Sequence, residues 1–362
     1  MDSHRKRVLF VYTRSSTFIS GDIEILSRHF DVSTLVTDNR NPARQSAELI
    51  RQLFYLILNI RKFDFVYIWF ADYHSWLPAF FAKLYGKKCY LVLGGYDVCR
   101  VKQYGYGSFV NPLRGWMARD SMKRASANLC VSNHVKRIAG KLAHDTPAYL
   151  LYNGISFPDS SKTRLPADGG RGGILCVALA RTKQSYKIKG IDRYLALAQA
   201  MPSFTFTLIG TDPEKAGVAK TDVPKNVKII PELEHKSLTE YYHKSKVYCQ
   251  LSRRESFSLA LAEAMFHGCM PLTTKAGGMP EVSGGLGEII YAADCDTFNR
   301  EDHESSVHEA INAVARLAAE SEDYAPAMRE RVMTLFTLEK RERDLLSIIS
   351  RDYKLKNSSH QS

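Results

Sequence analysis

The sequence lacks the patterns by which several large classes of protein are recognised. None of its seven cysteines forms a Cys-x-x-Cys pair, and several stand in apolar runs such as Asn128–Val131. Buried, reduced thiols of a cytosolic protein are therefore expected in preference to disulfides or a zinc site. A Gly-x-Gly-x-x-Gly motif is also absent, which counts against a dinucleotide-dependent oxidoreductase.

Long apolar runs are missing as well. Leu53–Ile60 is too short to cross a bilayer, and Phe63–Ala82 is interrupted by charged residues and by Pro78. The first apolar run, Val8–Tyr12, is too short for the core of a signal peptide. The sequence therefore predicts a cytoplasmic protein, with the inner face of the plasma membrane left open as its place of action.

The composition is that of a folded protein with an uneven distribution of charge. The chain has 362 residues, of which 45% are hydrophobic and 24% are charged, and this length favours two domains. The formal net charge is +12. Residues 1–170 contain 24 Lys and Arg against 13 Asp and Glu, whereas residues 171–362 contain 26 against 25. The surplus of positive charge therefore belongs to the first half.

Short apolar runs alternate with stretches of helical period, and the series occurs twice. This alternation predicts parallel sheets covered by helices, so we expect an α/β protein of two Rossmann-like, doubly wound domains. Residues 158–173 are rich in Pro, Gly, Ser and Asp and are expected to form the linker. Ligands of such sheets bind at the carboxyl ends of the strands. The expected strands are Val8–Tyr12, Val32–Val36, Phe65–Trp69, Cys89–Leu93, Asn128–Val131, Tyr149–Tyr152, Ile174–Leu179, Phe204–Ile209, Val227–Ile230, Val247–Leu251, Met270–Thr273 and Glu288–Tyr291.

The segment 252–265 carries the most informative pattern. Glu255 follows an expected strand, Ser256 or Ser258 suits the cap of the next helix, and Glu263 follows Glu255 by eight positions. Eight positions are about two helical turns, so both carboxylates could lie on one side of the helix. The helix start suits a diphosphate, and the carboxylates suit sugar hydroxyls. Two ordinary glutamates on a helix surface would show the same spacing.

The segment resembles the Glu-x7-Glu signature of the retaining glycosyltransferase family 4, whose members have the GT-B fold of two domains facing a central cleft. Further elements of that family have counterparts here in the same order, over about residues 174–285. They are Arg181 with Lys189-Gly190, the strand and glycine Phe206–Gly210, the segment His267–Pro271, and the Gly-Gly-x-Pro-Glu loop Ala276–Glu281.

The resemblance implies a role for each matching residue of the second half. Arg181 and Lys189 would neutralise the diphosphate of a nucleotide-sugar donor. Glu263 would hold the ribose, and Glu255 would contact the donor sugar near the reacting carbon. No metal or other cofactor is expected, because the cations and the helix start can stabilise the diphosphate. The residues at that helix start and Gly210 are expected to bind substrate; those at the helix start are Ser256, Phe257 and Ser258.

In the first half, Ser20-Gly21-Asp22 resembles the family's glycine loop, although it is also an ordinary helix entry. Tyr90–Asp97 resembles the family's strand that ends in His-Gly-x-Asp, with Gly95 and Asp97 kept and Gly94 standing where many members have His. The role of that His would be absent, or would be filled by Asp97, Tyr96 or His74. Asp97 could also cap a helix, and His74 is more simply explained as a surface residue at a helix start.

The fold class sends the final helix back onto the N-terminal domain. We therefore expect an acceptor-side domain of residues 1–157 plus a crossover helix at about 338–356, and a donor domain of residues 174–337. Leu345, Leu346, Ile348 and Ile349 should form the buried face of the crossover helix.

The function expected from the resemblance is transfer of a sugar, with retention, from a UDP- or GDP-sugar to a hydroxyl of a glycan or lipid-linked acceptor in cell-surface polysaccharide or glycolipid synthesis. The basic first half, with the expected helix Pro112–Lys123, suits peripheral contact with an anionic membrane, although a merely soluble basic face is the alternative. No module for nucleic-acid binding is visible. A sugar-nucleotide epimerase of the same fold and a catalytically degenerate binding protein remain as alternatives.

Overall fold

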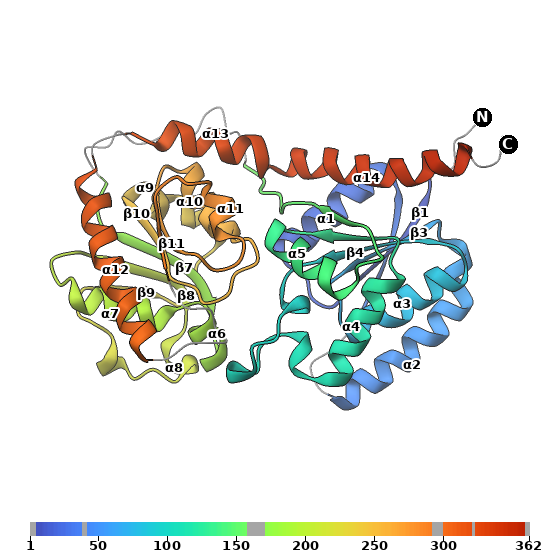
Figure 1. Cartoon of the computed structure of the whole chain (residues 1–362), viewed down its shortest axis with the longest axis horizontal. Helices are drawn as coiled ribbons and strands as arrows, with labels where there is room; N and C mark the ends of the chain where they lie inside the picture. Colours follow the sequence, from blue (N-terminus) through green and yellow to red (C-terminus); the bar gives the residue numbers. More distant parts are fainter. Residues whose placement is uncertain (1–4, 38–41, 158–170, 292–299, 321–322, 359–362) are drawn as a thin grey trace. The chain divides into compact units, whose positions relative to one another are not determined.

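The computed structural model describes residues 5–37, 42–157, 171–291, 300–320 and 323–358. The chain divides into two compact units. Unit 1 comprises residues 1–100, 106–154 and 338–362, and unit 2 comprises residues 101–105 and 155–337. Each unit contains a six-stranded parallel sheet covered by helices (Figure 1). The expected α/β class with the series repeated twice is confirmed.

The sheet of unit 1 has the strand order β2-β1-β3-β4-β5-β6. Its central strands read as continuous apolar runs, because helices cover both faces of a parallel sheet. The strands are β1 Arg7–Tyr12, β2 Asp31–Val36, β3 Phe65–Trp69, β4 Lys88–Leu93, β5 Ala127–Cys130 and β6 Ala148–Leu150. The α-helices are α1 Thr17–His29, α2 Pro42–Asn59, α3 Tyr73–Leu84, α4 Pro112–Arg124, α5 Asn133–Leu142 and α14 Leu338–Ser358, with the 3₁₀ turns η1 Ile60–Lys62, η2 Tyr96–Val98 and η4 Ser108–Val110.

The helices of unit 1 form two layers. The crossovers from β2 to β3, β4, β5 and β6 all advance in one direction across the sheet, so right-handed connections place α2 to α5 on one face. Neighbouring helices of this layer pack against one another in chain order. The crossover from β1 to β2 runs the other way, and α1 packs against α14.

The sheet of unit 2 has the strand order β12-β11-β10-β7-β8-β9. Its strands are β7 Ile174–Ala180, β8 Phe206–Thr211, β9 Val227–Ile230, β10 Val247–Gln250, β11 Met270–Thr274 and β12 Glu288–Ile290. Its α-helices are α6 Lys183–Ile188, α7 Ile191–Ala200, α8 Pro213–Ala216, α9 Leu238–Lys244, α10 Leu259–Phe266, α11 Met279–Ser283, α12 Arg300–Ala319 and α13 Ala325–Leu335, with the 3₁₀ turns η3 Lys102–Tyr104, η6 Lys220–Asp222 and η7 His235–Ser237.

The two units differ slightly from the domains drawn on the sequence. Residues 101–105 and 155–157 belong to unit 2, where the Ile155 N–H donates to the Phe336 carbonyl at 2.8 Å. Of the expected linker, residues 158–170 lie outside the described residues. The six described cysteines are free and buried, as expected, and Cys295 is not described. None of the described helices has the length and apolarity needed to cross a bilayer.

The final helix, α14, belongs to unit 1. Leu345, Ile348 and Ile349 are buried as expected, whereas Leu346 is only half-buried. The same helix supplies Arg341, whose guanidinium is buried against the carboxylate of Asp22 in α1.

The Asp22 carboxylate is fully satisfied inside the core of unit 1. It accepts hydrogen bonds from Arg341 Nε at 2.5 Å and Nη2 at 2.7 Å, from the Tyr67 hydroxyl at 2.6 Å and from the Trp69 indole at 2.8 Å. Arg341 Nη1 also donates to the carbonyls of Leu151 and Tyr152. This network joins both helices of one layer to β3 and to the segment after β6.

Removing one partner of this pair leaves a buried charge without compensation. We predict that Arg341→Ala lowers the free energy of unfolding by about 3–5 kcal/mol, measured by urea denaturation. Arg343→Ala on the exposed side of the same helix is the matched control and should change stability by less than about 0.5 kcal/mol. Equal losses in the two variants would contradict this account of the pair.

Candidate active site

The strand order of unit 2 reverses between β7 and β10. Open parallel sheets bind ligands beyond the carboxyl ends of the strands at such a switch point. The loop after β7 begins with Arg181 and leads through α6 to Lys189, and the loop after β10 contains Glu255. The topology therefore brings the two motif-bearing loops of this unit to one edge.

Lys189 and Glu255 meet directly at this edge. Lys189 Nζ lies 2.6 Å from Glu255 Oε2, although the residues are 66 positions apart. Gln250 Nε2 donates to the same oxygen at 2.9 Å, and the Ser256 N–H donates to Glu255 Oε1 at 3.2 Å. The carboxylate is thus held in place by a cation, an amide and its own loop. Gln250 is buried, and the sequence analysis did not single it out.

Two glycines of the matched motifs let main-chain segments approach this loop. A Cβ atom on Gly190 would lie 1.9 Å from the Leu251 carbonyl oxygen, and one on Gly277 would lie 1.6 Å from the Glu255 carbonyl oxygen. The Gly278 N–H donates to that same Glu255 oxygen at 3.0 Å. The Lys-Gly pair and the Gly-Gly-x-Pro-Glu loop therefore pack directly on the segment that carries Glu255.

A buried ion pair that the sequence analysis missed supports the same contact. Arg253 Nη1 and Nη2 donate to the two carboxylate oxygens of Asp192 at 2.7 and 2.9 Å. Burial opposes ionisation of Asp192, but the bonds from Arg253 and Lys187 outweigh it and lower the pKa of Asp192. The Arg253 N–H also donates to the Ile188 carbonyl. The loops after β7 and β10 are therefore fastened together beside Lys189.

The short helix α6 lies between Arg181 and Lys189 and accounts for the eight positions that separate them. Lys189 ends this short helix, whereas Arg181 precedes it and keeps 54% of its side chain exposed, 3.3 Å from Glu232. Lys187 pairs with Asp192, and Lys183 is exposed. Of the cations in this segment, Lys189 alone among those described contacts Glu255.

Ser258 begins α10, and its conformation is unusual. Its φ of +80° lies in the left-handed region, its hydroxyl accepts from the Leu261 N–H, and it donates to Gln250 Oε1 at 2.6 Å. The predicted cap is confirmed. The expected two helical turns between the glutamates are wrong, because Glu255 lies in the loop before α10 and only Glu263 lies in the helix. Phe257 buries its ring 5.1 Å from that of Phe336.

Glu263 is buried within unit 2 with its carboxylate partly satisfied. The Tyr242 hydroxyl donates to Oε2 at 3.1 Å, and His235 Nε2 lies 2.9 Å from Oε1. The hydrogen bond that the His235 ring makes to the Glu263 carboxylate raises the pKa of His235. Gly210, the last residue but one of β8, has a φ of +86°, and a Cβ there would lie 3.1 Å from the Ala178 carbonyl oxygen. Neither Tyr242 nor His235 stands out in the sequence, because both are far from the motifs.

In unit 1 the strand order reverses between β1 and β3. The expected glycine loop at Ser20–Asp22 is not a loop, because α1 begins at Thr17 and Gly21 lies inside it. A Cβ atom on Gly21 would lie 3.1 Å from Leu338 Cδ1. The glycine thus permits close packing of α1 on the start of α14, a contact between residues too far apart in the sequence to be anticipated.

Asp97 organises the turn after β4. It is fully buried, and its oxygens accept from the N–H groups of Ala71 at 3.1 Å, Gly94 at 3.2 Å and Gly95 at 2.6 Å. Burial raises the pKa of Asp97 to about 6, and the three main-chain donors act in the opposite direction. Gly95 has a φ of +110°, which only glycine adopts readily. The carboxylate joins the ends of β3 and β4, and its catalytic role remains a prediction.

Phe70 fills the space next to Gly94. A Cβ atom on Gly94 would lie 2.1 Å from Phe70 Cε1, so this backbone has no room for a histidine at position 94. Phe70 has a φ of +69°. Its ring contacts those of Trp69 and Phe18. Phe70 and Ser258 are the two non-glycine residues with positive φ in the described part of the chain, and each follows a strand at its unit's switch point. Strain of this kind clusters at functional sites.

His74 is not the surface residue that the sequence suggested. It lies in the first turn of α3, as expected, but it is buried, with Nε2 2.7 Å from the Trp69 carbonyl oxygen. Burial lowers the pKa of His74. The neighbouring Asp72 caps α3 and pairs with Arg114, so the imidazole lies behind a covered helix start.

Among the described residues, no three His, Cys, Asp or Glu side chains are grouped so as to hold a metal ion. The sequence does contain an Asp-x-Asp pair, Asp294 and Asp296, which lies outside the described residues.

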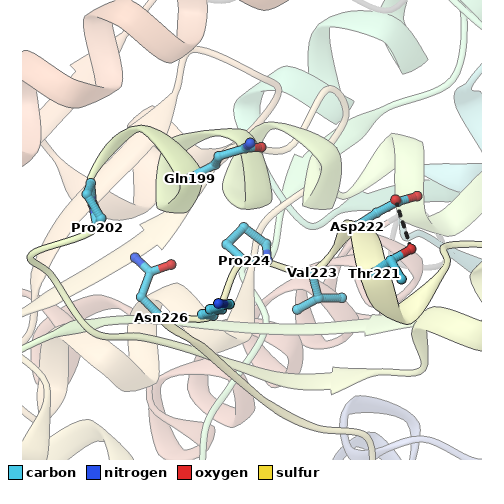
Figure 2. A pocket seen from close by; sticks show the side chains of 8 residues that line it. Gln199, Pro202, Thr221, Asp222, Val223, Pro224 and Asn226 are labelled. Carbon is cyan, nitrogen blue, oxygen red and sulfur yellow. Dashed lines mark hydrogen bonds between the residues drawn. The ribbon is translucent and has the colours of Figure 1, made fainter.

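A pocket of about 620 Å³ lies where α7 ends and β9 begins (Figure 2). Gln199 and Asn226 line it, and Asn226 Nδ2 donates to three carbonyls at the end of α7 and beyond. The start of β9 is at the amino edge of the sheet, away from the edge at which ligands of this architecture bind. We therefore assign no role in sugar transfer to this pocket.

Comparison with known proteins decides the class of the site. The family described as Glycosyl transferases group 1 matches residues 179–290, which include Arg181, Lys189, Glu255 and Glu263. Residues 179–290 therefore form a glycosyl transferases group 1 domain. The prediction of this family and of transfer from a nucleotide-sugar is thus confirmed. No curated protein matches the chain.

Solved structures show that the glycosyltransferase has the GT-B fold. Sucrose-phosphate synthase from Thermosynechococcus elongatus is similar with a TM-score of 0.74 and 14% identity, over 97% of this chain and 100% of that one. Anabaena HepE in complex with UDP and glucose gives a TM-score of 0.65 and 14% identity, over 96% and 100%. A UDP-forming α,α-trehalose-phosphate synthase from Burkholderia vietnamiensis gives 0.67 and 13%, also over 96% and 100%.

The crowding of Gly94 by Phe70 can be tested in the glycosyltransferase. We predict that Gly94→Ala lowers the free energy of unfolding by about 1–3 kcal/mol, because the new methyl group overlaps a packed ring. Gly140→Ala is the control, since a Cβ there meets nothing within 4 Å. Thermal unfolding measures both.

Adding Phe70→Gly should remove the cost of Gly94→Ala, because the two residues occupy the same space. Additive effects of the two substitutions would show that Phe70 does not fill that position.

Proposed function

We propose that the enzyme transfers a sugar with retention from a UDP- or GDP-sugar, bound by unit 2, to a hydroxyl of a glycan or lipid-linked acceptor bound by unit 1. The observation that carries the proposal is the Lys189–Glu255 contact beside the start of α10. It combines a cation suited to a diphosphate with a carboxylate suited to the donor sugar, at the switch point of the sheet.

The hydrogen-bond donors and the positive charges of Lys189 and Arg181 support their proposed role in binding the diphosphate. An ammonium has three donors, so Lys189 can bind a phosphate oxygen while keeping its bond to Glu255. Arg181, exposed at the end of β7, supplies a second cation for the diphosphate. These cations stabilise the negative charge that develops as the nucleoside diphosphate leaves, and such preorganised donors act mainly in the transition state.

Glu263 is proposed to hold the ribose. Its two oxygens offer about four acceptor positions, and Tyr242 and His235 use two of them. The remaining positions can accept hydrogen bonds from a ribose diol. Ser256, Ser258 and Gly210 are proposed to approach the donor around this point. The buried ring of Phe257 limits that residue to main-chain contacts.

The acceptor side is proposed for unit 1, with Asp97 and Gly95 in the turn after β4. HepE was solved with UDP and glucose, which supports UDP as the nucleotide of the donor here. We further propose that the acceptor belongs to cell-surface polysaccharide or glycolipid synthesis and is reached by peripheral contact with an anionic membrane. The charge supports this, because unit 1 contains 27 Lys and Arg against 15 Asp and Glu, whereas unit 2 contains 23 of each.

Donor turnover tests the proposal. We predict that a panel of UDP- and GDP-sugars contains one from which the wild-type enzyme releases nucleoside diphosphate, and that Lys189→Ala lowers this rate about a hundredfold. Glu255→Gln should lower it comparably, because it removes the charge that faces the sugar. A coupled assay for free nucleoside diphosphate measures all three.

Lys183→Ala is the matched control, since Lys183 is exposed on the same short helix and should retain the wild-type rate. Conversion of the donor to an isomeric sugar without an acceptor would favour an epimerase instead. Binding of a donor without any turnover would favour a degenerate binding protein.

A further inference from the structure

Helix α2 has two apolar faces, of which one is left open. Leu56 and Gln52 are buried on its inner face, where Gln52 Nε2 donates to the His74 carbonyl of α3 at 2.9 Å. The other face carries Ile50, Phe54, Ile57 and Leu58, whose side chains are 57%, 61%, 49% and 73% exposed. Their spacing puts all four on one stripe of the helix. The outward face of a helix on a globular protein normally carries polar residues.

The neighbouring helices α3 and α4 also expose apolar side chains. Helix α3 packs against both α2 and α4, and the three lie side by side on one face of the sheet (Figure 1). Leu84 of α3 is 63% exposed, and Leu113 and Trp116 of α4 are 60% and 54% exposed. We call the seven side chains Ile50, Phe54, Ile57, Leu58, Leu84, Leu113 and Trp116 the α2–α4 apolar face. They are seven of the twelve large apolar side chains that are strongly exposed among the described residues, which is a concentration that marks interaction surfaces.

Positive charge accompanies the apolar side chains. Arg119 and Lys123 are exposed on the same side of α4 as Trp116, and within the described residues neither has an ion-pair partner. Arg61 and Lys62 are exposed where α2 ends. The entire net charge of the chain belongs to this unit.

We propose that the α2–α4 apolar face docks on an anionic lipid bilayer, with α2 lying in the plane of the interface. Apolar side chains flanked by lysine and arginine fit the boundary between acyl chains and anionic head groups. A nucleic acid would pair with the cations but leave the apolar side chains in water. A second copy of this chain would cover the apolar side chains but bring together two units of high positive charge.

The inference deepens the proposed function, because a lipid-linked acceptor is presented at such a surface. It also differs from the sequence expectation, which placed the interfacial helix at Pro112–Lys123 alone. In the structure α4 contributes two apolar side chains, and α2 contributes four.

Vesicle flotation of the full chain, without donor or acceptor, tests the proposal separately from sugar transfer. We predict that the protein floats with vesicles of phosphatidylcholine and phosphatidylglycerol at low salt, and much less with phosphatidylcholine alone or at high salt. Phe54→Ser combined with Leu58→Ser should weaken the partition by more than about tenfold, because both side chains lose their apolar contact with lipid.

Tyr291→Ser is the matched control, since Tyr291 is 67% exposed in unit 2 and should leave flotation unchanged. Circular dichroism should show the wild-type fold for both variants. Flotation that is absent, or that the double variant retains, would overturn the proposal. So would a wild-type dimer in sedimentation that the double variant converts to monomer, because the face would then bind a second copy.

Discussion

The contact between Lys189 Nζ and Glu255 Oε2 depends on two loops that leave neighbouring strands of one sheet and must be brought within hydrogen-bond distance. Charged side chains alone would not achieve this, since a single exposed ion pair contributes little to stability. Close main-chain packing positions the loops, because Gly190 lies against the Leu251 carbonyl and Gly277 lies against the Glu255 carbonyl. The buried Arg253–Asp192 ion pair fastens the two segments as well. The two charged groups of the site are therefore held by contacts that a side chain at either glycine would prevent.

The two units differ in net charge in a way that matches their proposed roles, which are donor binding for unit 2 and acceptor and membrane contact for unit 1. Unit 2 has equal numbers of acidic and basic residues, and two of its cations, Arg181 and Lys189, are proposed to bind the diphosphate. Unit 1 carries the surplus, together with an open apolar face on α2 to α4. A soluble donor needs a few preorganised groups, whereas a membrane surface requires many weak contacts spread over an area. The two distributions of charge match these two requirements.

Much of the fold could be predicted from the sequence, because buried parallel strands read as short apolar runs, and each of the twelve expected runs overlaps a strand. The candidate site residues of the second half could also be identified from the sequence, since each of them lies in a short local motif. Other features depend on contacts that no local pattern reveals. Gly21 lies inside a helix beneath Leu338, His74 is buried behind β3, and Arg253 pairs with Asp192 across two loops. The apolar periodicity of the α2 segment predicts a helix, but it does not show that one apolar face of this helix stays exposed.

We propose that the nucleotide-sugar binds at the switch point of unit 2. A crystal structure of the enzyme with UDP tests it most directly. We predict the diphosphate within hydrogen-bond distance of Lys189 Nζ and the start of α10, with the ribose hydroxyls on Glu263. Nucleotide bound in the pocket between Gln199 and Asn226, or in unit 1, would contradict it.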